Sequence, residues 1–244
     1  MKTLTTITAF LVLLTTAVIF AQDAATAPVA AKVQIDDTGF DFGYIPAGAV
    51  VSHAYTLHSR GADSLKILSV RPGCGCTKAP LKKEVVAAGD STSVELVYTS
   101  NRAASGNFAK SATVTTNDTD RGNFQLTFKG KAYANPDSLT PLTLSLGEIA
   151  LTAQTRTQET KLTVKNVSAA PIRLSLVSDA GEYFAVGLPD AEIKPGQSKE
   201  IKVKLNSTLP EDQFQKSFTF AVNDKDGTRY TIPVSLNKPA VAVH

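Results

Sequence analysis

Residues 91–128 read STSVELVYTSNRAASGNFAKSATVTTNDTDRGNFQLTF, and three runs of alternating apolar residues follow one another in this stretch. The alternating positions are Val94, Leu96 and Tyr98, then Ala112 and Val114, then Phe124, Leu126 and Phe128. Strict alternation places such side chains on one face of a β-strand. The Asn, Asp and Gly residues between the runs favour turns. The stretch therefore predicts short strands, each with one buried face.

The rest of the chain shows the same pattern. Tyr55 and Leu57 occupy alternate positions, as do Leu65 and Ile67. Few stretches have apolar residues three and four positions apart, as an amphipathic helix would. About seven short strands per hundred residues, with turn signals every eight to twelve residues, are typical of an immunoglobulin-like β-sandwich. An antiparallel barrel is the alternative. The chain has no tryptophan, which excludes the Cys-Trp-Cys core of antibody domains. We expect an all-β fold.

The second half of the chain repeats the first, and most matching positions lie 107 residues apart. The matches are Phe40-Asp41-Phe42-Gly43 with Leu144-Ser145-Leu146-Gly147, Tyr55, Leu57 and Ser59 with Leu162, Val164 and Asn166, Ala88-Gly89-Asp90 with Pro195-Gly196-Gln197, Val94, Leu96 and Tyr98 with Ile201, Val203 and Leu205, and Phe108, Lys110 and Asn117 with Phe214, Lys216 and Asn223. The sequence therefore predicts two tandem immunoglobulin-like β-sandwiches, at residues 35–133 and 138–238. The linker between them is short enough for the two modules to touch.

The N-terminus has the features of an export signal. Residues 1–21 contain one early positive charge, an apolar run from Leu4 to Phe20, and Ala21 at the expected cleavage site. A transmembrane anchor is the alternative, but no positive cluster follows the run. We predict a signal peptide at 1–21, a flexible leader at 22–34, and no transmembrane anchor after cleavage.

The composition excludes several classes of protein. Apolar residues make up 43% of the 244 residues, and 25 basic residues face 22 acidic ones, so a disordered chain is excluded. The net charge of +3 is spread without a Lys/Arg-rich block, which argues against nucleic acid as a partner. Lys82, Lys83, Lys110 and Lys216 are expected to be solvated surface residues.

One stretch of the first unit has no match in the second: Arg71-Pro72-Gly73-Cys74-Gly75-Cys76-Thr77. It holds both cysteines of the chain. A shift of 107 places Gly181-Glu182-Tyr183 opposite Cys74-Gly75-Cys76, so the second unit has no thiol there. The cysteine pair is thus the main chemical difference between the two units.

The first unit resembles the bacterial DUF1573 family over residues 37–132. The resemblance rests on Phe42-Gly43, Gly48, Tyr55-Thr56-Leu57, Gly73-Cys74-Gly75-Cys76-Thr77, Gly89, Gly106-Asn107-Phe108-Ala109-Lys110 and Thr116-Asn117. It implies an exported protein with an immunoglobulin-like fold related to ASH and PapD-like modules, in which Phe42, Gly43, Gly89, Phe108 and Asn117 are structural. It implies no particular activity. Ser59 departs from the pattern, where asparagine is usual, as does Ala88, where proline is usual.

Cys74 and Cys76 could close a disulfide if the chain folds back at Gly75, and Gly73 and Thr77 would shape the same loop. Four roles stay open for the pair: a local clip, a redox or thiol-exchange site, capture of Cu(I) or Zn(II), and a bond to another protein. His53 could approach the cysteines as a further metal ligand. His58 is expected at the far end of the module, and His244 has no predicted role.

No sequence motif indicates an enzyme. The chain lacks a nucleophile elbow, an HExxH motif, a P-loop and a GxGxxG motif, and we predict no catalytic residue. Immunoglobulin-like sandwiches generally bind proteins through edge strands and end loops. The leading hypothesis is a non-catalytic exported envelope protein, periplasmic, surface-attached or secreted, that binds another envelope protein. The alternative is a periplasmic copper or thiol-redox handler centred on Cys74 and Cys76, and no other cofactor is expected.

Overall fold

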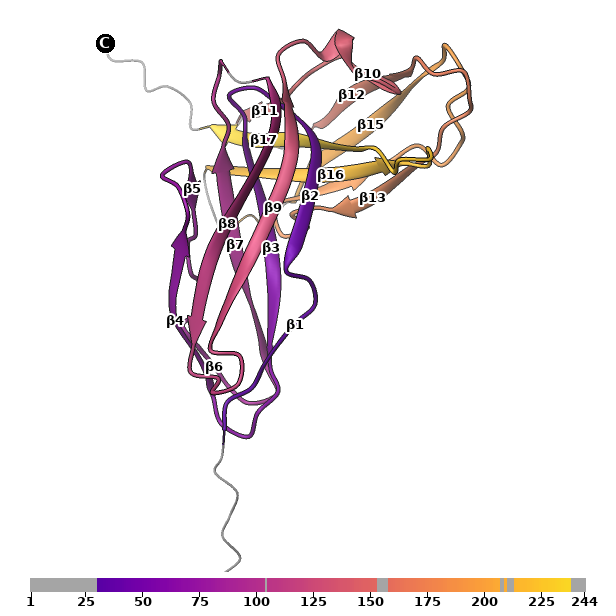
Figure 1. The fold of residues 1–244 in the computed structure, drawn as a ribbon. Coiled ribbons are helices and arrows are strands. Elements are labelled where there is room, and N and C mark those ends of the chain that lie inside the picture. Colours follow the sequence, from indigo (N-terminus) through magenta and orange to yellow (C-terminus); the bar gives the residue numbers. More distant parts are fainter. Residues whose placement is uncertain (1–29, 104, 153–157, 207–208, 210–212, 238–244) are drawn as a thin grey trace, which may run out of the picture.

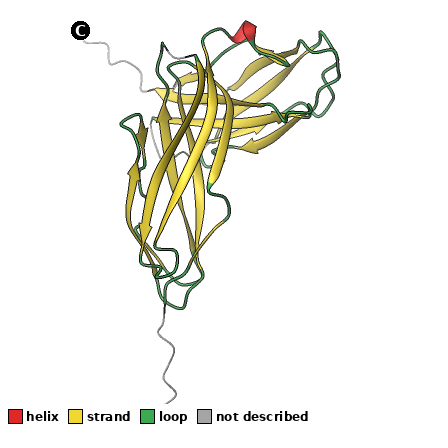
Figure 2. Cartoon of the chain, in the orientation of Figure 1, coloured by secondary structure: helices red, strands yellow, loops and turns green. Residues whose placement is uncertain are grey.

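The computed structural model describes residues 30–103, 105–152, 158–206, 209 and 213–237. Its regular elements are strands, apart from one short 3-10 helix at Pro136–Ser138 (Figure 2). The protein is therefore all-β, as predicted. Within these residues no helix is long and apolar enough to cross a membrane. The predicted signal peptide and most of the predicted leader lie outside the described residues.

The first module consists of two facing sheets (Figure 1). One sheet has the order β1-β3-β7-β5 and comprises Val33–Ile35, Val50–Ser59, Ser91–Thr99 and Thr77–Lys78. The other has the order β2-β9-β8-β4-β6 and comprises Gly39–Pro46, Asn123–Tyr133, Gly106–Thr116, Leu65–Pro72 and Val85–Val86. The module begins at Val33 rather than at residue 35, because β1 pairs with β3 from Val33 onward and the Asp118 carboxylate accepts the Val33 N–H at 2.8 Å.

The second module repeats this topology. Its first sheet, β10-β12-β15-β14, comprises Leu142–Leu144, Glu159–Asn166, Ser198–Leu205 and Phe184–Gly187. Its second sheet consists of β13 (Leu174–Ser178), β16 (Phe214–Val222), β17 (Arg229–Asn237) and β11 (Ile149–Thr152). In both modules the second strand pairs in parallel with the last, β2 with β9 and β11 with β17. The duplication predicted from the sequence is thus present in strand order as well.

The matched apolar positions form the two hydrophobic cores. Tyr55 and Leu57 on β3 are buried, as are Leu162 and Val164 on β12. The matched turns agree in detail, because Gly89 and Gly196 both have a positive φ, +85° and +76°. Their N–H groups donate to the carbonyls of Ser59 and Asn166, at 2.8 and 2.9 Å. Left-handed backbone of this kind favours glycine.

The two modules share one sheet. β17 pairs in parallel with β2 at Tyr230 and Tyr44, which joins a sheet of each module into one of nine strands (Figure 1). Gly43 has φ +62°, and a Cβ atom there would overlap the backbone carbonyl of Arg229. The Thr231 hydroxyl donates to the Phe42 carbonyl at 2.6 Å. The close approach of β17 to β2 therefore depends on a glycine at position 43.

Candidate functional site

The cysteine loop connects β4 to β5 at the end of the first module to which the second module is joined (Figure 1). Cys74 and Cys76 form a disulfide with their Cα atoms 5.3 Å apart. The Gly73 N–H donates to the Ser111 carbonyl of β8 at 2.9 Å, and the Thr99 N–H of β7 donates to the Cys76 carbonyl at 2.9 Å. The loop is therefore tied to a strand of each sheet.

The disulfide lies at the boundary between core and solvent. Cys74 and Cys76 are half-buried, and Cys76 packs against the hydrophobic core. Thr77 is buried, and its hydroxyl lies 3.4 Å from the Cys74 sulfur. Gly75, between the two half-buried cysteines, is exposed.

The two glycines of the loop have different surroundings. Gly75 does not adopt left-handed backbone, and a Cβ atom on it would meet no heavy atom within 4 Å. A Cβ atom on Gly73 would lie 3.3 Å from the Ser111 carbonyl oxygen, closer than side chains ordinarily approach. A side chain would therefore be tightly placed at Gly73, where the loop meets β8, and would have open space at Gly75.

His53 is not placed beside the cysteines. Its ring stacks on Phe40 with 3.6 Å between centroids, and Nδ1 lies 3.2 Å from the Ser178 hydroxyl of the second module. Burial lowers the pKa of His53 to about 4. Across the described part of the chain, no group of three or more His, Cys, Asp or Glu side chains is arranged to hold a metal ion. The three predicted metal ligands therefore do not form one cluster.

The other motif residues lie in cores, turns and the module junction. Phe42 is fully buried against Phe128, and Phe108 stacks on Tyr98 with 4.8 Å between centroids. The Asn117 side chain accepts the Lys66 N–H at 2.8 Å. The matching Asn223 accepts the Arg173 N–H at 2.7 Å, so the same asparagine ties the last hairpin to the neighbouring strand in both modules.

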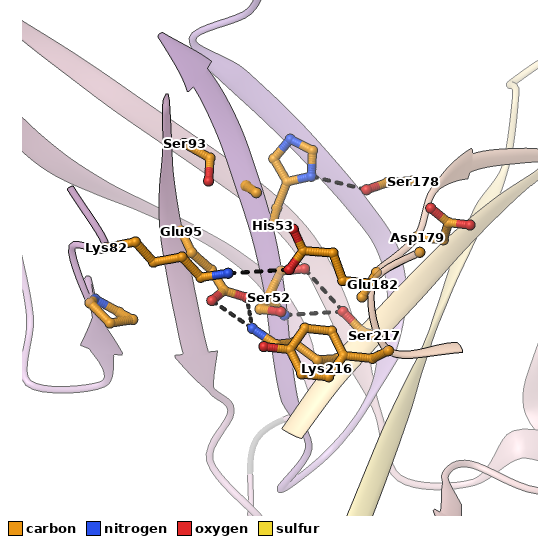
Figure 3. Close-up of a pocket in the computed structure, with 15 residues that line it drawn as sticks. Ser52, His53, Lys82, Ser93, Glu95, Ser178, Asp179, Glu182, Lys216 and Ser217 are labelled. Carbon is orange, nitrogen blue, oxygen red and sulfur yellow. Dashed lines mark hydrogen bonds and ion pairs between the residues drawn. The ribbon is translucent and has the colours of Figure 1, made fainter. Parts of the chain in front are cut away.

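A polar pocket of about 220 Å³ lies between the modules (Figure 3). On one side it is lined by Ser52, His53, Ser93 and Glu95 of the first module, and on the other by Ser178, Glu182, Tyr183, Lys216 and Ser217 of the second. Lys216 Nζ lies 2.7 Å from both carboxylate oxygens of Glu95. These side chains are only 13% and 15% exposed, so the expectation that Lys216 is solvated is wrong.

The second module also covers an open strand edge of the first. β1 pairs with β3 only at Leu57–Ser59, which leaves the backbone of β3 near Ser52 without a strand on that side. The Ser217 hydroxyl fills this place, since it accepts the Ser52 N–H at 3.0 Å and donates to the Ser52 carbonyl at 3.1 Å (Figure 3). A serine on β16 thus satisfies both backbone groups of Ser52.

The loop that docks on the first module corresponds to the cysteine loop. Gly181-Glu182-Tyr183, which match Cys74-Gly75-Cys76, line the pocket. Lys82 of the first module lies 3.3 Å from the Glu182 carboxylate, and Lys216 Nζ lies 4.8 Å from the centre of the Tyr183 ring. Sequence comparison of the two units aligned these residues, but nothing in the pattern indicated that one of the two loops makes a module contact.

Family models match both modules. Residues 33–132 match DUF1573, described as a protein of unknown function, which confirms the resemblance seen in the sequence. Residues 139–237 match a HYDIN/CFA65/VesB-like, Ig-like domain. No curated protein shows significant sequence similarity to the chain.

Solved structures show only distant likeness. A protein of unknown function from Porphyromonas gingivalis W83 is 12% identical with a TM-score of 0.35, and the match covers 84% of this chain and 99% of the other. The PapD-like domain 7 of human CEP192, an ASH / PapD-like domain, is 14% identical with a TM-score of 0.36 over 49% of this chain and 98% of the other. Vibrio cholerae VesB protease is 16% identical with a TM-score of 0.33 over 42% of this chain and 31% of the other.

Proposed function

We propose that the protein is a non-catalytic, exported envelope protein that binds another envelope protein through the cysteine-loop end of its first module. One observation carries the proposal. In the second module, the loop that matches the cysteine loop contacts a neighbouring sandwich, together with Lys216 and Ser217 of β16. The first module has the same elements in the same places, and among the described residues no sandwich is docked on them.

The corresponding surface of the first module consists of the cysteine loop, Lys110 and Ser111. Lys110 matches Lys216, which makes the ion pair with Glu95, and Ser111 matches Ser217, which binds the backbone of an open strand edge. Both residues of the first module are half-buried, and Gly75 is exposed. The partner would therefore present a strand with unpaired backbone groups and a carboxylate on the adjacent strand.

The disulfide contributes to binding by holding the loop in one conformation. The loop is fixed on both sides by backbone hydrogen bonds, and the disulfide fixes the segment between them. A loop that is ordered before binding loses less conformational entropy when a partner docks. In the second module no disulfide is needed, because the matching loop is already held by its neighbour.

Site-specific photocrosslinking in the producing cells tests the proposal. A photoreactive side chain at Gly75 has room, since a Cβ atom there meets no neighbour within 4 Å. The matched control is Asp63, an exposed residue before β4, at the other end of that strand. We expect one defined envelope protein to be captured from position 75 and not from position 63. Equal capture at both positions, or none at position 75, would overturn the proposal.

The exported state has its own test, the mass of the purified protein from its native host. Cleavage after Ala21 predicts a mature chain that begins at Gln22. An intact N-terminus in that protein, or recovery of the chain from the cytoplasmic fraction, would contradict export. Neither result bears on whether the cysteine loop binds a partner.

Thiol exchange is the second candidate, and the half-exposed disulfide favours it. In that reaction a thiolate of a partner attacks one sulfur, forms a mixed disulfide and releases the other sulfur as a thiolate. Copper binding requires that a reductant first open the disulfide. Trapping with a Cys76→Ser variant distinguishes the candidates. A mixed disulfide at Cys74 with one envelope protein supports exchange, whereas no mixed disulfide in this variant, together with capture from position 75 of the protein with an intact disulfide, supports binding without exchange.

A further inference from the structure

β13 is the outer strand of the nine-stranded sheet, and in the described structure only β16 pairs with it. It reads Leu174-Ser175-Leu176-Val177-Ser178, with no charged residue and no proline. Leu176 and Val177 are 42% and 38% exposed. The register with β16 shifts between Leu176 and Ser178, so that two successive apolar side chains face solvent.

The other outer strands of the described sheets, including the four-residue β11, are all shorter than the five residues of β13. β5 and β6 have two residues each and lie beside Lys78 and Glu84, and β1 and β10 have three residues each. β14 has four residues and ends at Gly187. Short strands, nearby charges and glycine are the usual means by which proteins prevent edge-to-edge pairing. β13 is longer than each of these strands and has no charge, proline or glycine within it, although Arg173 and Asp179 flank it, and it carries two exposed apolar side chains, Leu176 and Val177.

The sequence around β13 is complementary to itself. In an antiparallel pair of two copies centred on Leu176, Leu174 lies opposite Ser178 and Ser175 lies opposite Val177. The same register places Arg173 of each copy opposite Asp179 of the other, and both side chains are exposed. Opposite charges that face each other across a strand pair are stabilising, and the twofold axis produces the contact twice.

We propose that two copies of this chain associate through antiparallel pairing of β13, with Leu176 on the twofold axis and Arg173 facing Asp179. The nine-stranded sheet would then continue across both chains. This self-association goes beyond the proposed function, because the partner is the same chain and the surface lies on the second module. Each of the two proposals can therefore fail without the other.

The first test is the molar mass of the mature protein by sedimentation equilibrium over a range of micromolar concentrations. We expect a reversible dimer. Val177→Lys should give a monomer at the same concentrations, because it places a charge on the pairing edge. Leu68→Lys is the matched control, since Leu68 is a 60% exposed residue on β4 of the first module, and it should remain dimeric. A monomeric wild type, or equal effects of the two variants, would overturn the proposal.

A charge exchange tests the register. Arg173 also contacts Glu192 at 3.0 Å, so a single substitution there disturbs more than the dimer. Arg173→Asp and Asp179→Arg should each weaken dimerisation by roughly tenfold, since each variant creates two like-charge pairs. The double variant should recover most of the lost affinity. Failure of the double variant to recover it, with circular dichroism showing that the variants are folded, would rule out this register.

Discussion

Lys216 of the second module and Glu95 of the first form an ion pair, with Nζ 2.7 Å from both carboxylate oxygens and both side chains largely buried. The two residues are 121 positions apart in the sequence, and both line the polar pocket between the modules. It is reinforced by the Ser217 hydroxyl on the backbone of Ser52 and by the pairing of β17 with β2. These contacts hold the two sandwiches in one fixed arrangement.

We predict that Lys216→Met lowers the free energy of unfolding by about 2–3 kcal/mol, because it leaves the Glu95 carboxylate buried without a partner. Adding Glu95→Gln should recover part of the loss. The control is Glu200→Gln, which removes the exposed pair between Lys161 and Glu200 and should lower the free energy of unfolding far less. Urea unfolding measures all of these variants. Equal losses for the buried and exposed pairs would contradict the structural role of the module contact.

Gly43→Ala is expected to separate the modules, because the added methyl group would overlap the Arg229 carbonyl and the backbone has φ +62°. Gly75→Ala should be tolerated, since its side chain would point into open space. Thermal unfolding compares the two variants, and small-angle scattering reports the module arrangement. A Gly43→Ala variant with the thermal stability and module arrangement of the wild type would show that β17 does not approach β2 as described.

Ser59→Asn is predicted to stabilise the first module. The Ser59 hydroxyl is buried and has no hydrogen-bond partner among the described residues, whereas the matching Asn166 donates to the Ala170 and Ile193 carbonyls at 2.8 and 2.7 Å. An asparagine at position 59 could make the equivalent bonds, for a gain of about 1 kcal/mol. The reverse change, Asn166→Ser, should cost about 2 kcal/mol because it removes two hydrogen bonds, one to each of these carbonyls. Calorimetry of both variants measures whether the first is stabilised and the second destabilised. A destabilised Ser59→Asn protein would show that the site has no space for the larger side chain.

Stability should depend on pH through His53. Burial lowers its pKa to about 4 from an ordinary 6.5, so between these values the unfolded chain takes up a proton that the folded chain does not. The free energy of unfolding is therefore highest above pH 6.5 and decreases by up to about 3 kcal/mol as the pH falls toward 4. His53→Phe should flatten that part of the profile. Identical pH profiles for wild type and His53→Phe would refute the assignment.

The internal arrangement of each module could be predicted from the sequence, because period-two alternation reports which face of a strand is buried. The buried residues of β3, β7 and β9 and their matches on β12, β15 and β17 lie where the repeat places them. Matching turns, such as those at Gly89 and Gly196, also follow from local chemistry, since glycine accommodates their positive φ.

The contact between the modules could not be predicted in this way. Ser52 and Glu95 point away from the core of their own module, and a polar residue on an outer face gives the same pattern whether it faces water or another domain. Gly43 was recognisable as part of a motif. Glycine is required there because Arg229 approaches it closely, and Arg229 lies on a strand far along the chain. The same limit explains why Lys216 was expected in solvent and His53 beside the cysteines.

We propose that the cysteine-loop end of the first module binds a partner in the way the second module binds the first. The most direct measurement is photocrosslinking from Gly75 in cells that carry Lys110→Glu, with Lys165→Glu, an exposed residue of β12, as control. We expect the adduct seen in wild type to fall by about tenfold with Lys110→Glu, through loss of a charge pair and gain of a repulsion, and to be unchanged with Lys165→Glu. An adduct whose yield does not change with Lys110→Glu would contradict this mode of binding.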